Sequence, residues 1–284
     1  MLAPDDTLFL YPELNTRLVE LLRSLRPEDW ERQTVARLWK VKDVAAHLLD
    51  VTLRRVALHR DGWSSPPARP VRSQAELIGY LNEQNATWVN AARRLSPPIL
   101  IDMLAYAHRE MLEQFRNMDP DAPAVYPVSW AGESLSTNRF DIAREYTEHW
   151  LHQQQIRDAI GDQTLLHPAF YNVALQIFLR AWPFVLNDTA AAEGTLLKTV
   201  IRGVPGAEWY AIRTAEKWLL ESASSLAVSF PDAGAPQGIT EIDREEAWKL
   251  FSKSRRKEDI IGHYTITGNE QLATKVLDMI SVMA

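Results

Sequence analysis

The sequence predicts a mainly α protein, with a helical bundle in its N-terminal part and a small α+β domain with an antiparallel sheet in its C-terminal part. Apolar residues recur at spacings of three and four up to about residue 186, which is the period of a helix. Beyond that point the spacing changes to two, which is the period of a strand. We therefore expect two domains, residues 1–188 and residues 189–284.

Helical segments fill the N-terminal part. The helical period covers residues 12–25, 41–60, 73–94, 97–118, 138–160 and 168–186. Ser73 is a favourable N-cap, two prolines follow Ser96, and Gly161 can end its helix in the left-handed conformation. Residues 119–137 contain three prolines and no sustained period, so we expect a long ordered connection there.

The C-terminal part alternates apolar and polar residues over short runs. Strands are expected at residues 194–204, 208–214, 216–222, 225–230 and 263–267. Helices are expected at 243–253, with Asp243 as its cap, and at 269–283. Turn signals such as Pro205-Gly206 favour antiparallel pairing of the strands.

Composition and charge argue against several function classes. The net charge is -6 and the pI is near 5.7, with one short basic run at 253–257, so we expect no nucleic-acid partner. We find no apolar stretch that approaches a membrane span and no secretory signal, so we expect no membrane partner and a cytoplasmic location. The chain has no cysteine and therefore no thiolate of its own. A homodimer would be compatible with the apolar edges of a bundle.

His47, together with Glu148 and His152, has the residue types to hold one divalent metal ion. Residues four apart lie one helical turn apart and can converge on one point, and His47 lies within the apolar stripe of its own helix. Three such ligands leave a coordination position open, as in catalytic zinc sites. Glu145 and His149 form a second pair with the same spacing, and the period does not choose between the two pairs. A core histidine satisfied by hydrogen bonds is the alternative interpretation of His47.

Two motifs carry a family resemblance. The first is a tryptophan, valine, aspartate and histidine-leucine series, at Trp39, Val41, Asp43, His47 and Leu48. The second is a glutamate four residues before a histidine that leads into Ile-Arg-x-Ala-x-Gly. Both resemble the N-terminal domain of the mycothiol-dependent maleylpyruvate isomerase family, which belongs to the DinB-like metal-binding four-helix bundles. Residues 243–280 look like the family's C-terminal domain, of sterol-carrier-protein type, so the resemblance spans nearly the whole chain.

The resemblance implies a metal site and a thiol cosubstrate. It implies that His47, Glu148 and His152 hold zinc or another divalent metal. It also implies a low-molecular-weight thiol, mycothiol or an equivalent, held on the metal as the nucleophilic thiolate. The family usually has an aspartate three residues after the second histidine, whereas this chain has Gln155, which accepts hydrogen bonds but supplies no charge.

The implied activity is isomerisation or thiol transfer on a small, anionic, electrophilic substrate. Arginines suit such a substrate. Those available are Arg54, Arg109, Arg144, Arg202 and Arg213. We predict substrate contacts for Arg202 and Arg213, and for His149 beside the metal. The alternative hypothesis is a non-catalytic protein that binds a metal or a small apolar ligand.

Overall fold

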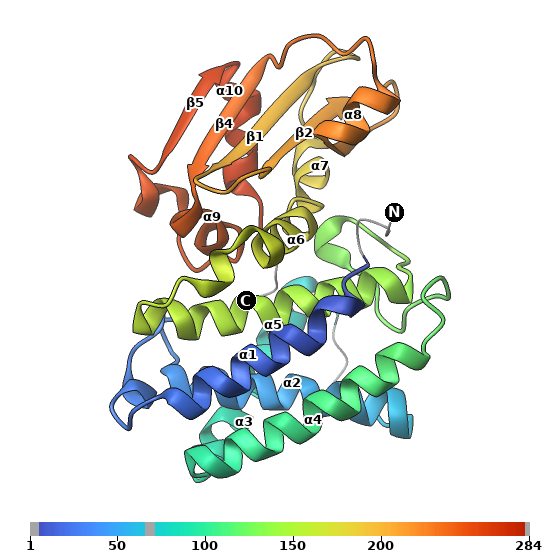
Figure 1. Cartoon of the computed structure of the whole chain (residues 1–284). Helices are drawn as coiled ribbons and strands as arrows, with labels where there is room; N and C mark the ends of the chain where they lie inside the picture. Colours follow the sequence, from blue (N-terminus) through green and yellow to red (C-terminus); the bar gives the residue numbers. More distant parts are fainter. Residues whose placement is uncertain (1–5, 66–71, 282–284) are drawn as a thin grey trace. The chain divides into compact units, whose positions relative to one another are not determined.

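The computed structural model describes residues 6–65 and 72–281 (Figure 1). The chain forms two compact units. The helical unit comprises residues 6–122 and 137–164, and the sheet unit comprises residues 123–136 together with the chain from residue 165 onward. The chain therefore leaves the helical unit after residue 122 and returns to it at residue 137. The domain boundary expected after residue 188 stays a prediction.

The helical unit is built on long helices. They are α1 (Tyr11–Ser24), α2 (Val41–Asp61), α3 (Gln74–Ala92), α4 (Pro97–Asn117) and α5 (Asn138–Ile160). The predicted bounds of these helices are confirmed to within about two residues. Helix α2 packs against α4 and α5, helix α1 packs against the same two helices, and α3 packs against α2. The expected four-helix bundle is therefore made by α1, α2, α4 and α5.

Helix α5 runs through the interior of the unit. It begins at Thr137, whose hydroxyl accepts a hydrogen bond from the backbone N–H of Phe140 at 3.3 Å. It ends at Gly161, which has the left-handed φ of 79° expected there. Between these ends most side chains are buried, including several acids and histidines. Buried ionisable groups need partners, so the neighbouring helices determine what these side chains do.

The sheet unit contains a five-stranded sheet in the order β3-β2-β1-β4-β5. The strands are β1 (Leu196–Arg202), β2 (Glu208–Arg213), β3 (Trp218–Ser222), β4 (Gly238–Asp243) and β5 (Tyr264–Gly268). Three pairings are antiparallel, but β1 and β4 are parallel. The antiparallel pairing expected among the strands at 194–222 is confirmed, and the parallel pair makes the sheet mixed because β4 is a strand that the sequence did not predict. The chain between β3 and β4 includes helix α8 (Ala223–Ser229), and such a crossover is what parallel pairing requires.

Two local predictions in this unit are wrong. Residues 225–230, expected as a strand, belong mostly to α8, because Ser222 and Ser225 form a capping box that starts a helix. The final helix expected at 269–283 is the short α10 (Glu270–Ala273) followed by a 3-10 turn at Thr274–Asp278. Residues 282 and 283 lie outside the described residues. Helices α9 (Arg244–Phe251) and α10 both pack against β1 and β4.

The apolar stretch 168–186 forms two helices instead of one. They are α6 (Pro168–Phe178) and α7 (Ala181–Leu186). By length and composition this stretch passes as a membrane span, which the sequence reading did not expect, but 56% of it is buried in the structure. Phe178 and Trp182 are fully buried. The apolar character of the stretch is therefore explained by core packing.

Candidate metal centre

The structure brings together His47 from α2 and Glu148 and His152 from α5, which we call the His47 cluster. One ligand atom from each residue lies within 4.8 Å of the other two. The Nε2 atoms of His47 and His152 are 3.3 Å and 3.1 Å from the same oxygen, Oε1 of Glu148. Both imidazoles are buried, whereas 25% of the Glu148 side chain is exposed. The donor atoms converge on one point, and the carboxylate forms the open side of the cluster.

Gln155 sets the orientation of His152. Its amide oxygen lies 2.8 Å from Nδ1 of His152 and can only accept a hydrogen bond, so Nδ1 carries the proton. In this tautomer the lone pair is on Nε2, which faces the Glu148 oxygen, itself an acceptor. Two acceptors at this distance need a proton or a cation between them. Gln155 thus orients the histidine from the position where the family usually has an aspartate.

Burial and neighbouring charges set the protonation of the cluster. Burial lowers the pKa of His47 to about 4, and the charge of His152 acts in the same direction, so His47 is neutral at neutral pH. Burial alone would raise the pKa of Glu148, but the charges and hydrogen bonds of His152 and His47 hold it well below its usual range. A neutral imidazole and an ionised carboxylate are the forms that bind metals.

These residues fit a divalent metal ion. Imidazole nitrogen and carboxylate oxygen are zinc ligands, and a set of two histidines and one glutamate leaves a fourth position open. The ring of Trp39 packs beside the cluster, with its centroid 4.6 Å from that of His47 and 6.0 Å from that of His152. Trp39 is the first residue of the tryptophan, valine, aspartate and histidine-leucine motif. Its ring supplies an apolar wall next to the donor atoms.

The rival pair, Glu145 and His149, belongs to a different set of contacts. Glu145 Oε2 accepts a hydrogen bond from Arg55 Nε at 2.7 Å, and the other two guanidinium nitrogens donate to Asp141 at 2.8 Å and 3.0 Å. We call Arg55, Asp141 and Glu145 the Arg55 network. His149 is buried, with Nε2 3.6 Å from Glu145 Oε1 and its ring 5.2 Å from that of His108. The substrate contact expected of His149 stays a prediction.

The two other predicted substrate residues lie in the sheet unit, Arg202 on β1 and Arg213 on β2. Arg202 donates to Asp243 at 2.9 Å. The same carboxylate lies 2.9 Å from Nδ1 of His263, so one acid contacts both side chains. No observation tests the substrate role of Arg202 or Arg213.

Asp43 acts at the start of α2. Its carboxylate accepts a hydrogen bond from the backbone N–H of Lys40 at 3.1 Å, which completes a capping box. It also accepts hydrogen bonds from Arg93 at 3.0 Å and 3.2 Å. Asp43 therefore fixes the beginning of the helix that carries His47.

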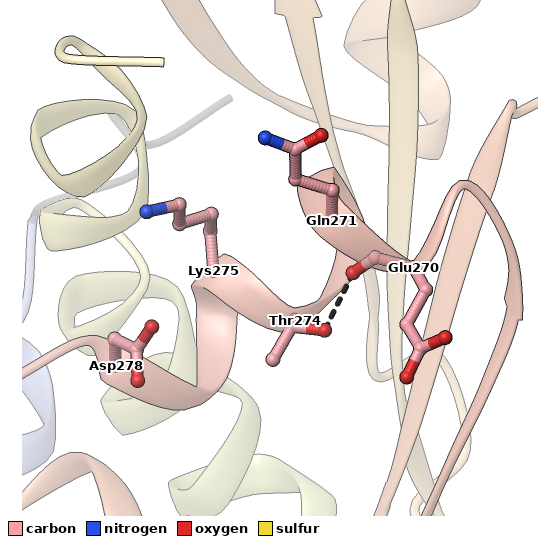
Figure 2. A pocket seen from close by; sticks show the side chains of 5 residues that line it. All are labelled: Glu270, Gln271, Thr274, Lys275 and Asp278. Atoms are coloured by element: carbon pink, nitrogen blue, oxygen red, sulfur yellow. Dashed lines mark hydrogen bonds between the residues drawn. The ribbon is translucent and has the colours of Figure 1, made fainter.

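Two surface hollows lie apart from the His47 cluster. The larger, of about 580 Å³, follows α10 and the 3-10 turn after it, and Figure 2 shows its polar lining of Glu270, Gln271, Thr274, Lys275 and Asp278. The smaller, of about 250 Å³, is in the helical unit and is lined partly by Leu22, Trp30 and Ile101. Neither is lined by a residue of the cluster. In Figure 2 the acidic groups of Glu270 and Asp278 point apart and gather no ligand set.

The fold and the cluster define a helical bundle with a candidate metal site, followed by an α+β part. The family model of the mycothiol maleylpyruvate isomerase N-terminal domain matches residues 11–157, just over half of the chain, and the chain belongs to this family. It is thus a member of an isomerase family.

Solved structures share the fold over most of the chain. A crystal structure of a histidine-to-alanine variant of the mycothiol-dependent maleylpyruvate isomerase matches with a TM-score of 0.53 and 12% identity, covering 94% of this chain and 93% of that one. Another structure of the mycothiol-dependent maleylpyruvate isomerase matches with a TM-score of 0.52 and 11% identity, covering 89% and 90%. No curated protein matches this chain in sequence.

Proposed function

We propose that this protein is a divalent-metal-dependent enzyme that activates a low-molecular-weight thiol, as in the maleylpyruvate isomerase family. The observation that carries the proposal is the convergence of His47, Glu148 and His152 on one point, with two imidazole nitrogens facing one carboxylate oxygen. Zinc is the metal we expect from two buried imidazoles and a carboxylate. Mycothiol, or an equivalent thiol, is the cosubstrate suggested by the family description.

The side chains of the site have distinct roles in this proposal. A divalent metal in the cluster would lower the pKa of a thiol at its open position and so favour the thiolate, which this cysteine-free chain cannot supply. Gln155 keeps the Nδ1 proton on His152, so that its Nε2 lone pair faces the site. His47 stays neutral through its burial, and Trp39 keeps water from one side.

The proposed reaction is isomerisation of, or thiol transfer to, a small anionic electrophile. The thiolate sulfur adds to an electron-poor carbon–carbon double bond, and the π electrons move to a conjugated carbonyl as an enolate. The former double bond is now single and rotates. Return of the electron pair expels the thiolate and gives the trans isomer. In a transfer reaction the enolate instead takes up a proton, and the sulfur remains on the product.

The remaining parts of the proposal follow the sequence expectations. The partners would be a small-molecule substrate and the thiol, with neither nucleic acid nor membrane, and the location would be the cytoplasm. We also propose that His149, Arg202 and Arg213 contact the substrate. We further propose that the protein forms a homodimer.

The test is the metal content of protein purified without chelator and then reconstituted with zinc. We expect about one zinc ion per chain in the wild type and a large loss in His47→Ala, Glu148→Gln and His152→Ala. Glu145→Gln and His59→Ala are matched controls on the same two helices. Both should keep the metal, because neither residue belongs to the cluster.

Two results would contradict the proposal. The first is a wild-type protein that binds no zinc after reconstitution. The second is zinc lost from Glu145→Gln but kept in Glu148→Gln, which would move the site to the rival pair. Zinc binding without turnover of an activated alkene in the presence of a thiol would favour the non-catalytic alternative.

A further inference from the structure

Arg54 lies on α2 seven residues after His47, on the same face and two turns farther along. Side chains on a helix lean toward its N-terminus, so Arg54 leans back toward His47. Its contacts agree with this direction: Nη2 lies 3.2 Å from Asp50, four residues earlier, and 3.5 Å from Asn85 Oδ1 on α3.

The guanidinium of Arg54 has N–H groups that donate no hydrogen bond within the described residues. Both of its contacts use Nη2, and within residues 6–65 and 72–281 neither Nε nor Nη1 has a partner. The side chain is 47% exposed, whereas that of Asp50 is 13% exposed. Asp50 therefore anchors the guanidinium from the protein side and leaves its remaining donors to solvent or to a ligand.

Arg144 on α5 is the natural rival for such a role. Helices α2 and α5 are antiparallel, because His47 meets Glu148 while Arg55, later on α2, meets Glu145, earlier on α5. Arg144 lies one turn before Glu148 and hence at the same end of the cluster as Arg54. It leans away from Glu148, however, and both Nε and Nη2 bind Asp141. Arg54 is the one of the two that leans toward the cluster with donors unused.

We propose that Arg54 is the side chain that binds the carboxylate of the anionic substrate in the proposed reaction. An arginine fork matches a carboxylate in both charge and geometry. Its position beside the cluster would hold the carboxylate in place while the double bond lies at the open coordination position. This inference rests on the proposed function and names the group that selects the substrate class.

The test measures the affinity of maleate, a small dicarboxylate, by isothermal titration calorimetry. The samples are wild type, Arg54→Met, Arg54→Lys and Arg116→Met, each zinc-loaded and each metal-free. Arg116 is an exposed arginine of α4 and serves as the matched control. We expect maleate to bind about 10- to 100-fold more weakly to Arg54→Met. Arg54→Lys should lose less, because it keeps the charge but not the fork, and Arg116→Met should match the wild type.

Equal maleate affinity in Arg54→Met and wild type would overturn the inference, as would a wild type that binds no maleate. Zinc content is measured on the same samples, so that a failure of the Arg54 inference can be told apart from a failure of the proposed function. A wild type without zinc counts against the metal-dependent enzyme. The comparison of the metal-free variants still decides whether Arg54 binds a carboxylate.

Discussion

The His47 cluster and the Arg55 network both join α2 to α5 in the interior of the helical unit. They differ in the partner that α2 offers to the carboxylates of α5. In the Arg55 network, α2 presents a permanent cation, and its donors are matched by Asp141 and Glu145. In the His47 cluster, α2 presents an imidazole, and two imidazole nitrogens face one carboxylate oxygen. The same spacing of glutamate and histidine therefore gives a closed ion pair in one place and a site ready for a cation in the other. The residue on the opposite helix decides between them.

Protonation reinforces this contrast. Burial alone would lower the pKa of Arg55, but Glu145 and Asp141 raise it, so the guanidinium stays charged. Burial likewise would raise the pKa of Glu145, but Arg55 lowers it. His47 is instead driven toward its neutral form by burial. The side chain that α2 supplies is therefore charged in the Arg55 network and neutral in the His47 cluster.

Removing the cation of the Arg55 network should have the largest effect. Arg55→Met leaves the buried Glu145 without its hydrogen-bonded guanidinium and leaves Asp141 with Arg144 alone, and we expect it to lower the free energy of unfolding by about 3–5 kcal/mol, measured by urea titration. Arg93→Met is the control, because the Arg93 side chain is 55% exposed and its pair with Asp43 should contribute at most about 1 kcal/mol. Equal losses in the two variants would show that the network is not a buried ion pair.

Removing the group that orients His152 should weaken metal binding without unfolding the protein. We expect Gln155→Leu to lower the zinc affinity about 10- to 100-fold, measured by competition with a chelator. Gln154→Leu is the matched control, since Gln154 is equally buried and its amide oxygen has no partner among the described residues. Gln155→Asp should bind zinc more tightly than wild type. The same zinc affinity in both leucine variants would contradict the role of Gln155.

Acid should destabilise the metal-free protein through two buried histidines, His47 of the cluster and His108 beside His149. Burial, with the charge of His149, lowers the pKa of His108 well below 6.5, and the pKa of His47 is about 4. Below pH 6.5 both histidines take up protons in the unfolded chain but not in the folded one. Their stabilising contribution is therefore complete above pH 6.5 and falls, by about 1.4 kcal/mol per pH unit for each histidine, as the pH drops.

The measurement is urea unfolding between pH 7.5 and pH 5.5 with chelator present. His108→Leu should reduce the slope of unfolding free energy against pH by the contribution of one histidine, about 1.4 kcal/mol per pH unit. A slope below pH 6.5 that is unchanged in this variant would show that His108 is protonated in the folded protein.

The smallest effect is expected at the start of α5. Thr137→Ala removes the hydroxyl that accepts from Phe140, and it should cost about 1 kcal/mol of unfolding free energy while leaving the zinc affinity unchanged. This end of α5 is next to Asp141 rather than to His152, so the Arg55 network should loosen first. Thr87→Ala, at an exposed position within α3, is the control. A parallel loss of zinc affinity in Thr137→Ala would show that the two regions are not separable.

Much of the helical unit could be predicted, because its residues obey local rules. Thr137 and Gly161 mark both ends of α5, and the period of its apolar residues is helical. The period could not choose between the Glu145 and Glu148 pairs, since both face inward. The missing information was Arg55, eight residues after His47, whose contact with Glu145 depends on the packing of α2 against α5. The family resemblance, and not the spacing, selected Glu148.

The sheet unit was harder to predict, because its buried positions are not all apolar. Strand β4 was not expected, since its buried residues include Gly238 and Thr240. A Cβ atom at Gly238 would lie 3.1 Å from side-chain atoms of Leu197 and Ala273, so the close approach of these neighbours favours glycine there. The hydroxyl of Thr240 donates to the backbone of Ala273 at 2.8 Å. Polar and small residues thus hide the alternation that marks a strand.

The return of the chain to the helical unit at residue 137 has a consequence for biosynthesis. His47 and Glu148 are 101 residues apart, and α5 joins the bundle only after the segment 123–136 has been made. At typical rates of translation α2 waits roughly 5 to 20 s for its partner. During this time the buried face of α2 lacks α5, and Arg55 lacks both of its acids. The His47 cluster is therefore completed late, and a nascent chain that stops before His152 has only part of it.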